Sequence, residues 1–324
     1  MKGRLLLSLA LIVSVPTFAA RPKCGAEPKI VSASSVHGRL SLGANNVRLY
    51  LWAIGAKGML GVTAGPTIDD PESMPPVRNV GLCPLAQILH ETSERATELV
   101  KNLERFTATE QIEHTEFQKN GKPRRPTSER FGYVAEMKEN PYGEFWVHEY
   151  RTAERQSDPP PVVENATAAS ALIFHPKIIG DFEVYCEGQT DLQGTPAWQL
   201  QFEERPNPSK SFSAFQINGI EYPVRLKGRA WISVDNYQLL RLQRDLVAPV
   251  PEIKLEFEHS DITYAPVEFA NHRLSLWLPK IASMDIVYRG HRYRRVHSFS
   301  HFQLFLIETE EKVKEPVSPT PKSD

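Results

Sequence analysis

The sequence predicts an α+β fold: one long N-terminal amphipathic helix, then a strongly curved antiparallel sheet that forms an open half-barrel, with a short inserted helix. Apolar residues recur at helical spacing over Pro84 to Phe106. After Thr107 most apolar residues instead alternate with polar ones at the two-residue period of a strand. Turn signals such as Asn120-Gly121 separate these segments, which is typical of an antiparallel meander.

The first residues, MKGRLLLSLALIVSVPTFAA, predict a secretory signal peptide over residues 1–19. Lys2 and Arg4 precede an apolar run from Leu5 to Val15, and small residues follow it. This run is shorter than the ~20 residues that a membrane-spanning helix needs. We therefore expect an extracytoplasmic protein, periplasmic or secreted, with no transmembrane segment in its mature form.

The charge balance argues against nucleic acid as a partner. The chain has 38 Lys and Arg against 39 Asp and Glu, a net charge of −1, whereas nucleic-acid binding draws most of its affinity from a basic excess.

Three cysteines in an oxidising compartment allow one disulfide. Spacing does not decide its connectivity. We favour Cys83 with Cys186, because both lie beside predicted elements while Cys24 lies in an irregular leader.

The rest of the chain divides into three parts. Residues 20–83 are rich in proline and glycine and predict an irregular extension, in which Val36 to Gly55 offers short strands. Residues 84–312 hold the helix and the sheet. Residues 313–324 are polar and proline-rich, which predicts a disordered tail. Within the sheet, the apolar parity changes between Phe257 and Ile262, so we expect a β-bulge near Ser260.

The stretch RGHRYRRVHSFSHFQLF raises the question of a ligand site. Gly290 predicts a hairpin turn, and the following strand places Arg295, His297 and His301 on one face. Residues four apart on a strand lie ~13 Å apart, so the two histidines cannot share a zinc ion, whose bonds to nitrogen are about 2 Å long. The arginines form a candidate patch for an anion or an acidic envelope partner: Arg289, Arg292, Arg294 and Arg295. The alternative is a solvated hairpin edge guarded by charge, which needs no ligand. On either reading we expect the change of Arg292, Arg294 and Arg295 to alanine to leave the fold intact.

Catalytic motifs are not found in the sequence. There is no Gly-x-Ser-x-Gly elbow, no His-Glu-x-x-His, no phosphate-binding loop and no dinucleotide fingerprint. We therefore predict no catalytic, metal or cofactor-binding residues and no cofactor. The strand tryptophans Trp146, Trp198, Trp231 and Trp277 are interpreted as core residues.

The stretches LKGRAWISVDNYQLLRLQRDL, PVPEIKLEFEHSDITYAPV and LWLPKIASMDIVYRGHRYRRVHSFSHFQLF resemble a family of uncharacterised secreted bacterial proteins. The resemblance covers roughly residues 84–307. In element order the chain is also similar to the periplasmic lipoprotein carriers of the LolA/LolB type. That similarity implies an unclosed barrel whose helices cover a hydrophobic cavity for acyl chains, and it transfers no binding residue.

These observations favour a non-catalytic envelope protein that binds an apolar or amphiphilic ligand, an acyl chain or lipid, in the half-barrel. The apolar stretch Ala168 to Phe174 predicts a lid over the concave face, with Leu172, Ile173 and Phe174 as candidate lid residues. A second hypothesis is a structural or interaction protein whose core is filled by its own side chains and whose basic hairpin contacts an acidic partner. An envelope hydrolase is the third hypothesis, and the sequence favours it least.

Overall fold

The computed structural model describes residues 65–70, 74–78, 83–103, 105–139, 145–153, 167–206, 208, 211–217 and 220–305. The predicted signal peptide, most of the predicted extension and the predicted tail lie outside these residues. In the described part, an antiparallel sheet with few helices dominates the structure, as predicted.

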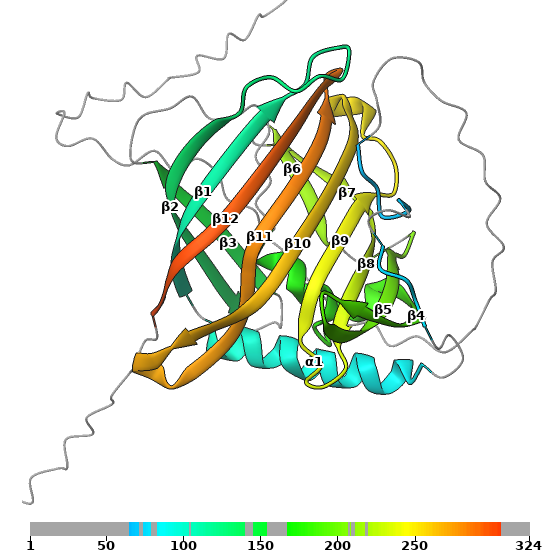
Figure 1. The fold of residues 1–324 in the computed structure, drawn as a ribbon, viewed down its shortest axis with the longest axis vertical. Coiled ribbons are helices and arrows are strands. Elements are labelled where there is room, and N and C mark those ends of the chain that lie inside the picture. The colour runs from blue at the N-terminus through cyan, green and yellow to red at the C-terminus, as the bar shows by residue number, and fades with distance from the viewer. Residues whose placement is uncertain are drawn as a thin grey trace, which may run out of the picture.

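Ten strands form the main sheet among the described residues, in the order β3-β2-β1-β12-β11-β10-β9-β8-β5-β4 (Figure 1). The strands of its first half are β1 (Arg105–Glu116), β2 (Thr127–Glu139), β3 (Phe145–Ala153), β11 (Leu274–Tyr288) and β12 (His291–Phe305). Those of its second half are β4 (Phe182–Leu192), β5 (Thr195–Glu204), β8 (Leu226–Ser233), β9 (Leu239–Leu246) and β10 (Leu255–Phe269). A separate hairpin pairs β6 (Ser213–Ile217) with β7 (Ile220–Val224). The last strand, β12, returns to pair with β1, so the sheet joins distant parts of the chain.

The helical elements are α1 (Leu85–Asn102) and the 3-10 segments η2 (Ala169–Phe174), η3 (Ile179–Asp181), η4 (Pro251–Ile253) and η5 (Ala270–His272). The predicted helix was too long at its C-terminal end. Leu103 has non-helical backbone angles, and Phe106 belongs to β1, where it pairs with both β2 and β12. Phe106 fits the helical period and the strand period equally well, and the two neighbouring strands decide between them.

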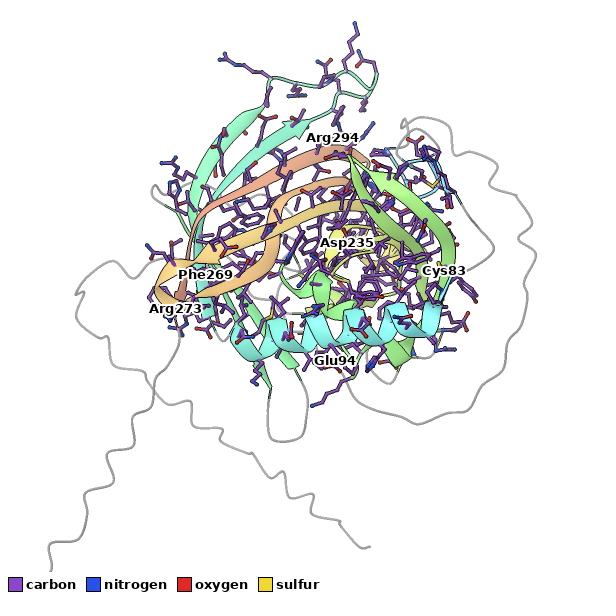
Figure 2. All side chains as sticks on the ribbon, turned by 60° about the horizontal axis from the view of Figure 1, so that its bottom comes forward. Cys83, Glu94, Asp235, Phe269, Arg273 and Arg294 are labelled. Carbon is purple, nitrogen blue, oxygen red and sulfur yellow. A yellow bond between two sulfur atoms is a disulfide. The ribbon has the colours of Figure 1, made fainter. Side chains whose placement is uncertain are left out.

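The sheet arches over α1, which lies across one end of the strands (Figures 1 and 2). It is not strongly curled, so the predicted half-barrel is wrong in its degree of curvature. Among the described residues the edge strands β3 and β4 do not pair with each other. Two-residue periodicity assigns side chains to faces, but it does not specify how far a sheet bends.

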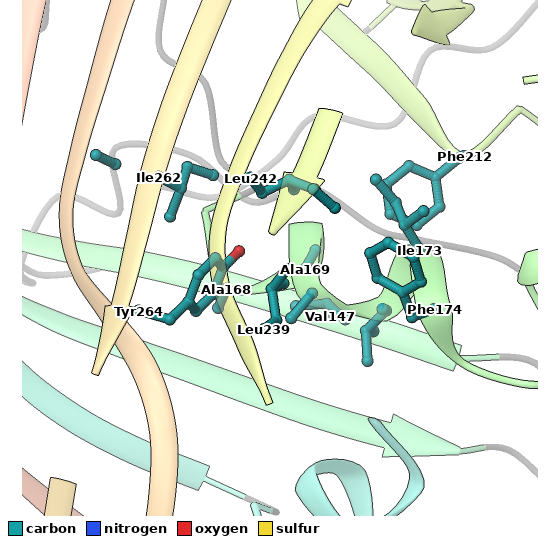
Figure 3. Close-up of a cluster of buried hydrophobic side chains, with 14 of the residues drawn as sticks. Val147, Ala168, Ala169, Ile173, Phe174, Phe212, Leu239, Leu242, Ile262 and Tyr264 are labelled. Atoms are coloured by element: carbon teal, nitrogen blue, oxygen red, sulfur yellow. The ribbon is translucent and has the colours of Figure 1, made fainter. Parts of the chain in front are cut away.

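The concave face of the sheet packs against η2, the short inserted helix, whose six residues are all buried. Ile262 on β10 and Leu242 on β9 lie beside η2 in the hydrophobic core (Figure 3). Val147 on β3 reaches the same cluster from the other half of the sheet. Side chains therefore fill much of the space that a half-barrel would leave open.

The opposite face of the sheet carries the segment that precedes α1. The backbone N–H of Ile68 donates to Asp245 on β9 over 3.1 Å, and the carbonyl of Ile68 accepts from Arg229 on β8. Farther along, Arg78 forms a β-bridge with Gln189 on β4. Residues 65–70 thus lie on the outer face of the sheet, and Arg78 lies at its β4 edge.

Candidate functional site

A pocket of about 400 Å³ lies between α1, η2 and the β10–β11 end of the sheet. Ligand pockets in proteins typically measure about 300–1,000 Å³, so its size suits a small or chain-like ligand. Its apolar wall consists of Ala96, Leu99, Ala171, Phe174, Leu239, Leu274, Leu276 and Trp277. Its polar wall consists of Thr92, Arg95, Glu98, Lys101, Asn102, Gln238, Tyr264 and Ser275. The pocket is therefore amphiphilic.

Hydrogen bonds fix α1 as one wall of this pocket. The Ser93 hydroxyl donates to the carbonyl of Phe174, at the end of η2, over 2.8 Å. Arg95 Nε donates to the carbonyl of Asn236 in the β8–β9 turn over 3.2 Å. The apolar face of α1 supplies the packing, and these polar contacts fix its distance from η2 and from the sheet.

The rim of the pocket is charged. Arg95 pairs with Glu98 one helical turn later at 2.6 Å, and Lys101 lies in the last turn of α1. A cation there also interacts favourably with the helix dipole. Deeper in the pocket wall, burial raises the pKa of the Tyr264 hydroxyl, against an opposing effect from Arg244. Tyr264 is therefore a neutral phenol at physiological pH.

The predicted lid residues are all buried, but only one of them borders the pocket. Phe174 lines it together with Ala171. Leu172 and Ile173 instead belong to the hydrophobic core that covers the concave face of the sheet. The sequence thus identifies η2 as an element over the concave face. It gave no indication that the pocket would open at the end of η2 that faces α1.

The structure does not bring the four arginines of the predicted patch onto one surface. Asp285 on β11 is in register with Arg294 on β12, and it accepts hydrogen bonds from Arg292 over 2.9 Å and from Arg294 over 2.8 Å. The quoted stretch has no acid of its own, but the facing strand supplies one. Arg289 stacks on the ring of Tyr288 at 5.0 Å, in a turn where it and Gly290 have positive φ.

Arg295 lies farthest from its predicted position on the surface, because its side chain is buried. Its side chain is only 3% exposed and lies on the inner face, where its Nε is 3.4 Å from His114. Burial lowers its pKa to about 10, and Arg151 acts in the same direction. Arg292 and Arg294 lie on the outer face, so the four arginines do not form one surface.

A buried ionic cluster lies on the inner face of β1, β3 and β12. Arg151 reaches across the ring of Tyr133 and donates to Glu110 at 2.6 and 2.9 Å. Nδ1 of His297 lies 2.8 Å from the same carboxylate. Burial opposes the charge on Glu110, but Arg151 and His297 together lower its pKa to about 2. Burial is the main cause that lowers the pKa of His297.

Sequence reasoning missed this cluster, although a signal was present. Glu110 shares strand parity with Phe106 and Ala108, so it falls on the buried face of β1. Glu149 likewise lies on the buried face of its strand, β3. Its carboxylate accepts a hydrogen bond from the backbone N–H of Ala168, next to η2, over 2.9 Å, and burial raises its pKa. A charged residue at core parity predicts a buried partner.

The structure also describes the other predicted residues, except the side chain of Trp146. Cys83, before α1, and Cys186 on β4 form a disulfide with a Cα–Cα distance of 6.2 Å.

The two histidines that the sequence raised as metal ligands lie apart in exposure. His297 is buried and His301 is exposed, with positive φ. In the described ranges no group of three or more His, Cys, Asp or Glu is placed to hold a metal ion. Trp231 and Trp198 are buried, whereas Trp277 lines the pocket.

No protein-family profile and no curated protein sequence matches the chain. Two solved structures show similarity of fold only. One is a DUF1329 family protein from Desulfovibrio piger, with a TM-score of 0.38 and 9% identity, covering 69% of this chain and 94% of that one. The other is a putative outer membrane lipoprotein-sorting protein domain from Vibrio parahaemolyticus, with a TM-score of 0.37 and 10% identity, covering 70% and 94%. Similarity at this level carries no functional argument, so function is argued from the residues of this chain.

Proposed function

We propose that this protein is a non-catalytic, extracytoplasmic binder of an amphiphilic ligand, an acyl chain or a lipid. The ligand occupies the pocket between α1, η2 and the β10–β11 end of the sheet. The observation that carries this proposal is the mixed lining of the pocket. Leucines, Phe174 and Trp277 line it together with charged and amide side chains of α1 and the β8–β9 turn.

The apolar side favours a hydrocarbon chain. Leu239 and Leu276 are nearly buried, and Leu99 is partly exposed. Removing apolar surface from water stabilises a complex by roughly 25 cal/mol per Å². The rim then keeps a polar headgroup near water and near Arg95 and Lys101. An amphiphile satisfies both sides at once, whereas a purely polar solute leaves the leucines uncovered.

The absence of catalysis is part of the proposal. The buried histidine–carboxylate pair on the concave face is His297 with Glu110, and both side chains are almost completely buried. Nε2 of His297 has no hydrogen-bond partner among the described residues. A nucleophile activated by a base needs a hydrogen bond between the two, so this pair supports a structural role.

The extracytoplasmic location rests on the predicted signal peptide and is consistent with the disulfide between Cys83 and Cys186, since such bonds persist in oxidising compartments. Within the part of the chain that the structure describes, every helix is too short or too polar to traverse a lipid bilayer.

A side-chain-filled structural protein is the second candidate, because η2 and the core cluster occupy the concave face. Native mass spectrometry of the protein purified from the organism that makes it separates the two. We expect an additional mass that is released by organic solvent and identified as a lipid or a fatty acid. Protein that carries no such mass, and gains none when titrated with lauric acid, would favour the structural role.

A further inference from the structure

A positively charged turn joins β1 to β2 at the end of the sheet away from α1 and the pocket (Figure 1). Nine consecutive residues, Phe117 to Arg125, contain four cations and no acid. We call this segment the basic turn, and its cations are Lys119, Lys122, Arg124 and Arg125. All four residues are exposed. The whole chain has a net charge of only −1, so the basic turn is a local concentration of positive charge.

Hydrogen bonds fix the backbone of the basic turn. The N–H of Gln118 donates to the carbonyl of Lys122 over 2.9 Å, and the N–H of Gly121 donates to the carbonyl of Gln118 over 2.8 Å. The N–H of Phe117 donates to the carbonyl of Arg292 on β12 over 2.9 Å. The guanidinium of Arg292 also lies 4.4 Å from the centre of the Phe117 ring. The turn is therefore joined to the main sheet and presents its cations at a defined place.

The protein leaves most of this charge unbalanced. Glu116, at the base of the turn, lies 3.6 Å from Arg124 and 3.7 Å from His291. The other three cations of the basic turn form no ion pair within the described residues. On β12 the situation differs, because Asp285 pairs with Arg294 at 2.8 Å. Like charges that lie close together repel one another, so folding does not explain why these cations gather in one turn.

The chemistry of the basic turn indicates a diffuse anionic surface as its partner. A docked protein buries an apolar core from which lysine is depleted, whereas the segment from Gln118 to Ser128 contains no aromatic or large aliphatic side chain. The near-neutral chain argues against nucleic acid. The surface of a bilayer with anionic lipid needs no matching shape. Each cation near such a surface strengthens binding about fivefold.

We propose that the basic turn docks this protein on the surface of a bilayer that contains anionic phospholipid. This proposal goes beyond the proposed function and does not depend on the pocket, which lies at the other end of the sheet. Because the turn has no apolar anchor, binding is peripheral and reversible. Because it is electrostatic, it weakens as salt screens the charges.

Sedimentation with vesicles tests the proposal on the protein in its secreted form. One set of vesicles contains phosphatidylcholine and phosphatidylglycerol, and the other contains phosphatidylcholine alone. At low salt we expect partitioning onto the anionic vesicles to be stronger by roughly a hundredfold, from about fivefold for each of three or more cations. This preference should disappear at about 1 M salt, where charges are screened beyond roughly 3 Å.

The triple change Lys119→Gln, Lys122→Gln and Arg125→Gln should lower partitioning onto the anionic vesicles to the level of the neutral ones. These residues are exposed, so the circular dichroism spectrum and the urea midpoint should stay those of the wild type. Equal partitioning of the triple variant and the wild type would overturn the proposal. Equal partitioning of the wild type onto both sets of vesicles, or onto neither, would also overturn it.

Two further variants separate the basic turn from net charge. Arg105→Gln, Arg205→Gln and Arg273→Gln together remove the same charge from exposed positions outside the turn, and should leave the preference for anionic vesicles within about twofold of the wild type. Lys119→Arg with Lys122→Arg keeps the charge of the turn and should keep the preference. A loss of partitioning in the first control as large as in the triple variant would show that net charge, and not the basic turn, binds the bilayer.

Discussion

The Ser93 hydroxyl on α1 donates a hydrogen bond to the backbone carbonyl of Phe174, at the end of η2, over 2.8 Å. This bond joins two walls of the pocket, because Phe174 lines it directly and α1 forms its opposite side. Ser93 itself is buried. The width of the pocket therefore depends on a polar contact as well as on apolar packing.

Replacing Ser93 with alanine should weaken this junction. The carbonyl of Phe174 loses its partner in a buried site, and we expect the free energy of unfolding to fall by about 1–2 kcal/mol. Urea denaturation followed by circular dichroism measures the change. Ser300→Ala, at an exposed position of β12, is the matched control and should shift the free energy by less than about 0.5 kcal/mol. Equal effects of the two changes would contradict the structural role of Ser93.

Acid should destabilise the protein in two stages. Burial lowers the pKa of His297 below its ordinary value of 6.5, so below pH 6.5 the unfolded chain binds more protons than the folded one and the folded state loses free energy. Glu110 adds a second loss as the pH falls from 4.5 toward about 2, the value to which Arg151 and His297 lower its pKa. Glu149, whose pKa is raised, acts in the opposite direction: its stabilising contribution is present below pH 4.5 and is lost as the pH rises through its folded pKa.

The first stage can be isolated by His297→Gln, whose amide still donates to Glu110 but does not titrate. Urea unfolding at pH 7.5, 6.5 and 5.5 should show stability falling with pH in the wild type and changing less in the variant. Parallel pH curves for the two proteins would show that His297 is not the group responsible.

The two arginines that are adjacent in β12 should respond differently to truncation. Arg295 is 3% exposed, and its replacement by alanine leaves a cavity on the inner face, so we expect a loss of roughly 2 kcal/mol or more. The Arg294 side chain is 42% exposed and contributes one of two bonds to Asp285, so Arg294→Ala should cost less than about 1 kcal/mol. Chemical denaturation of both variants decides the matter. A larger loss of unfolding free energy for Arg294→Ala than for Arg295→Ala would contradict the placement of Arg295 on the buried face of β12 and Arg294 on the outer face.

Removing the disulfide should destabilise the protein substantially. Cys83 and Cys186 are 103 residues apart in the chain, and a loop of that length is worth about 4–5 kcal/mol in the chain-entropy account. The double change Cys83→Ser with Cys186→Ser should therefore lower the urea midpoint strongly. Reduction of the wild type by dithiothreitol should match it. A midpoint that moves with neither treatment would show that the bond does not constrain the unfolded chain.

The sequence predicted those features that local periodicity determines. Phe131, Tyr133, Ala135 and Met137 alternate along β2, and all four are buried. Gly290 marks the β11–β12 turn, where it has a positive φ. The expected bulge near Ser260 was displaced: the register of β10 shifts instead between Leu255 and Phe257 and between Thr263 and Tyr264. The change in the alternation of apolar residues shows that the register of the strand shifts, whereas pairing with the neighbouring strand decides where the shift occurs.

Features that depend on contacts between distant segments were not predictable in this way. Asp285 neutralises Arg294 from the facing strand, so the composition of one strand gave a false patch. Glu110 and His297 meet only because β12 returns to pair with β1. The pocket arises where α1, η2 and β11 converge, and no local pattern in the sequence indicates that convergence.

Blocking the pocket tests the central claim most directly. Leu99 lines the pocket, whereas Leu89 lies on the same helix and packs against the core outside it. Binding of 11-(dansylamino)undecanoic acid, followed by dansyl fluorescence, should weaken by roughly tenfold or more in Leu99→Trp, which corresponds to a loss of about 1.4 kcal/mol, and should stay near the wild-type value in Leu89→Trp. Equal affinity in all three proteins, or no binding to the wild type, would contradict an amphiphile site between α1 and the sheet.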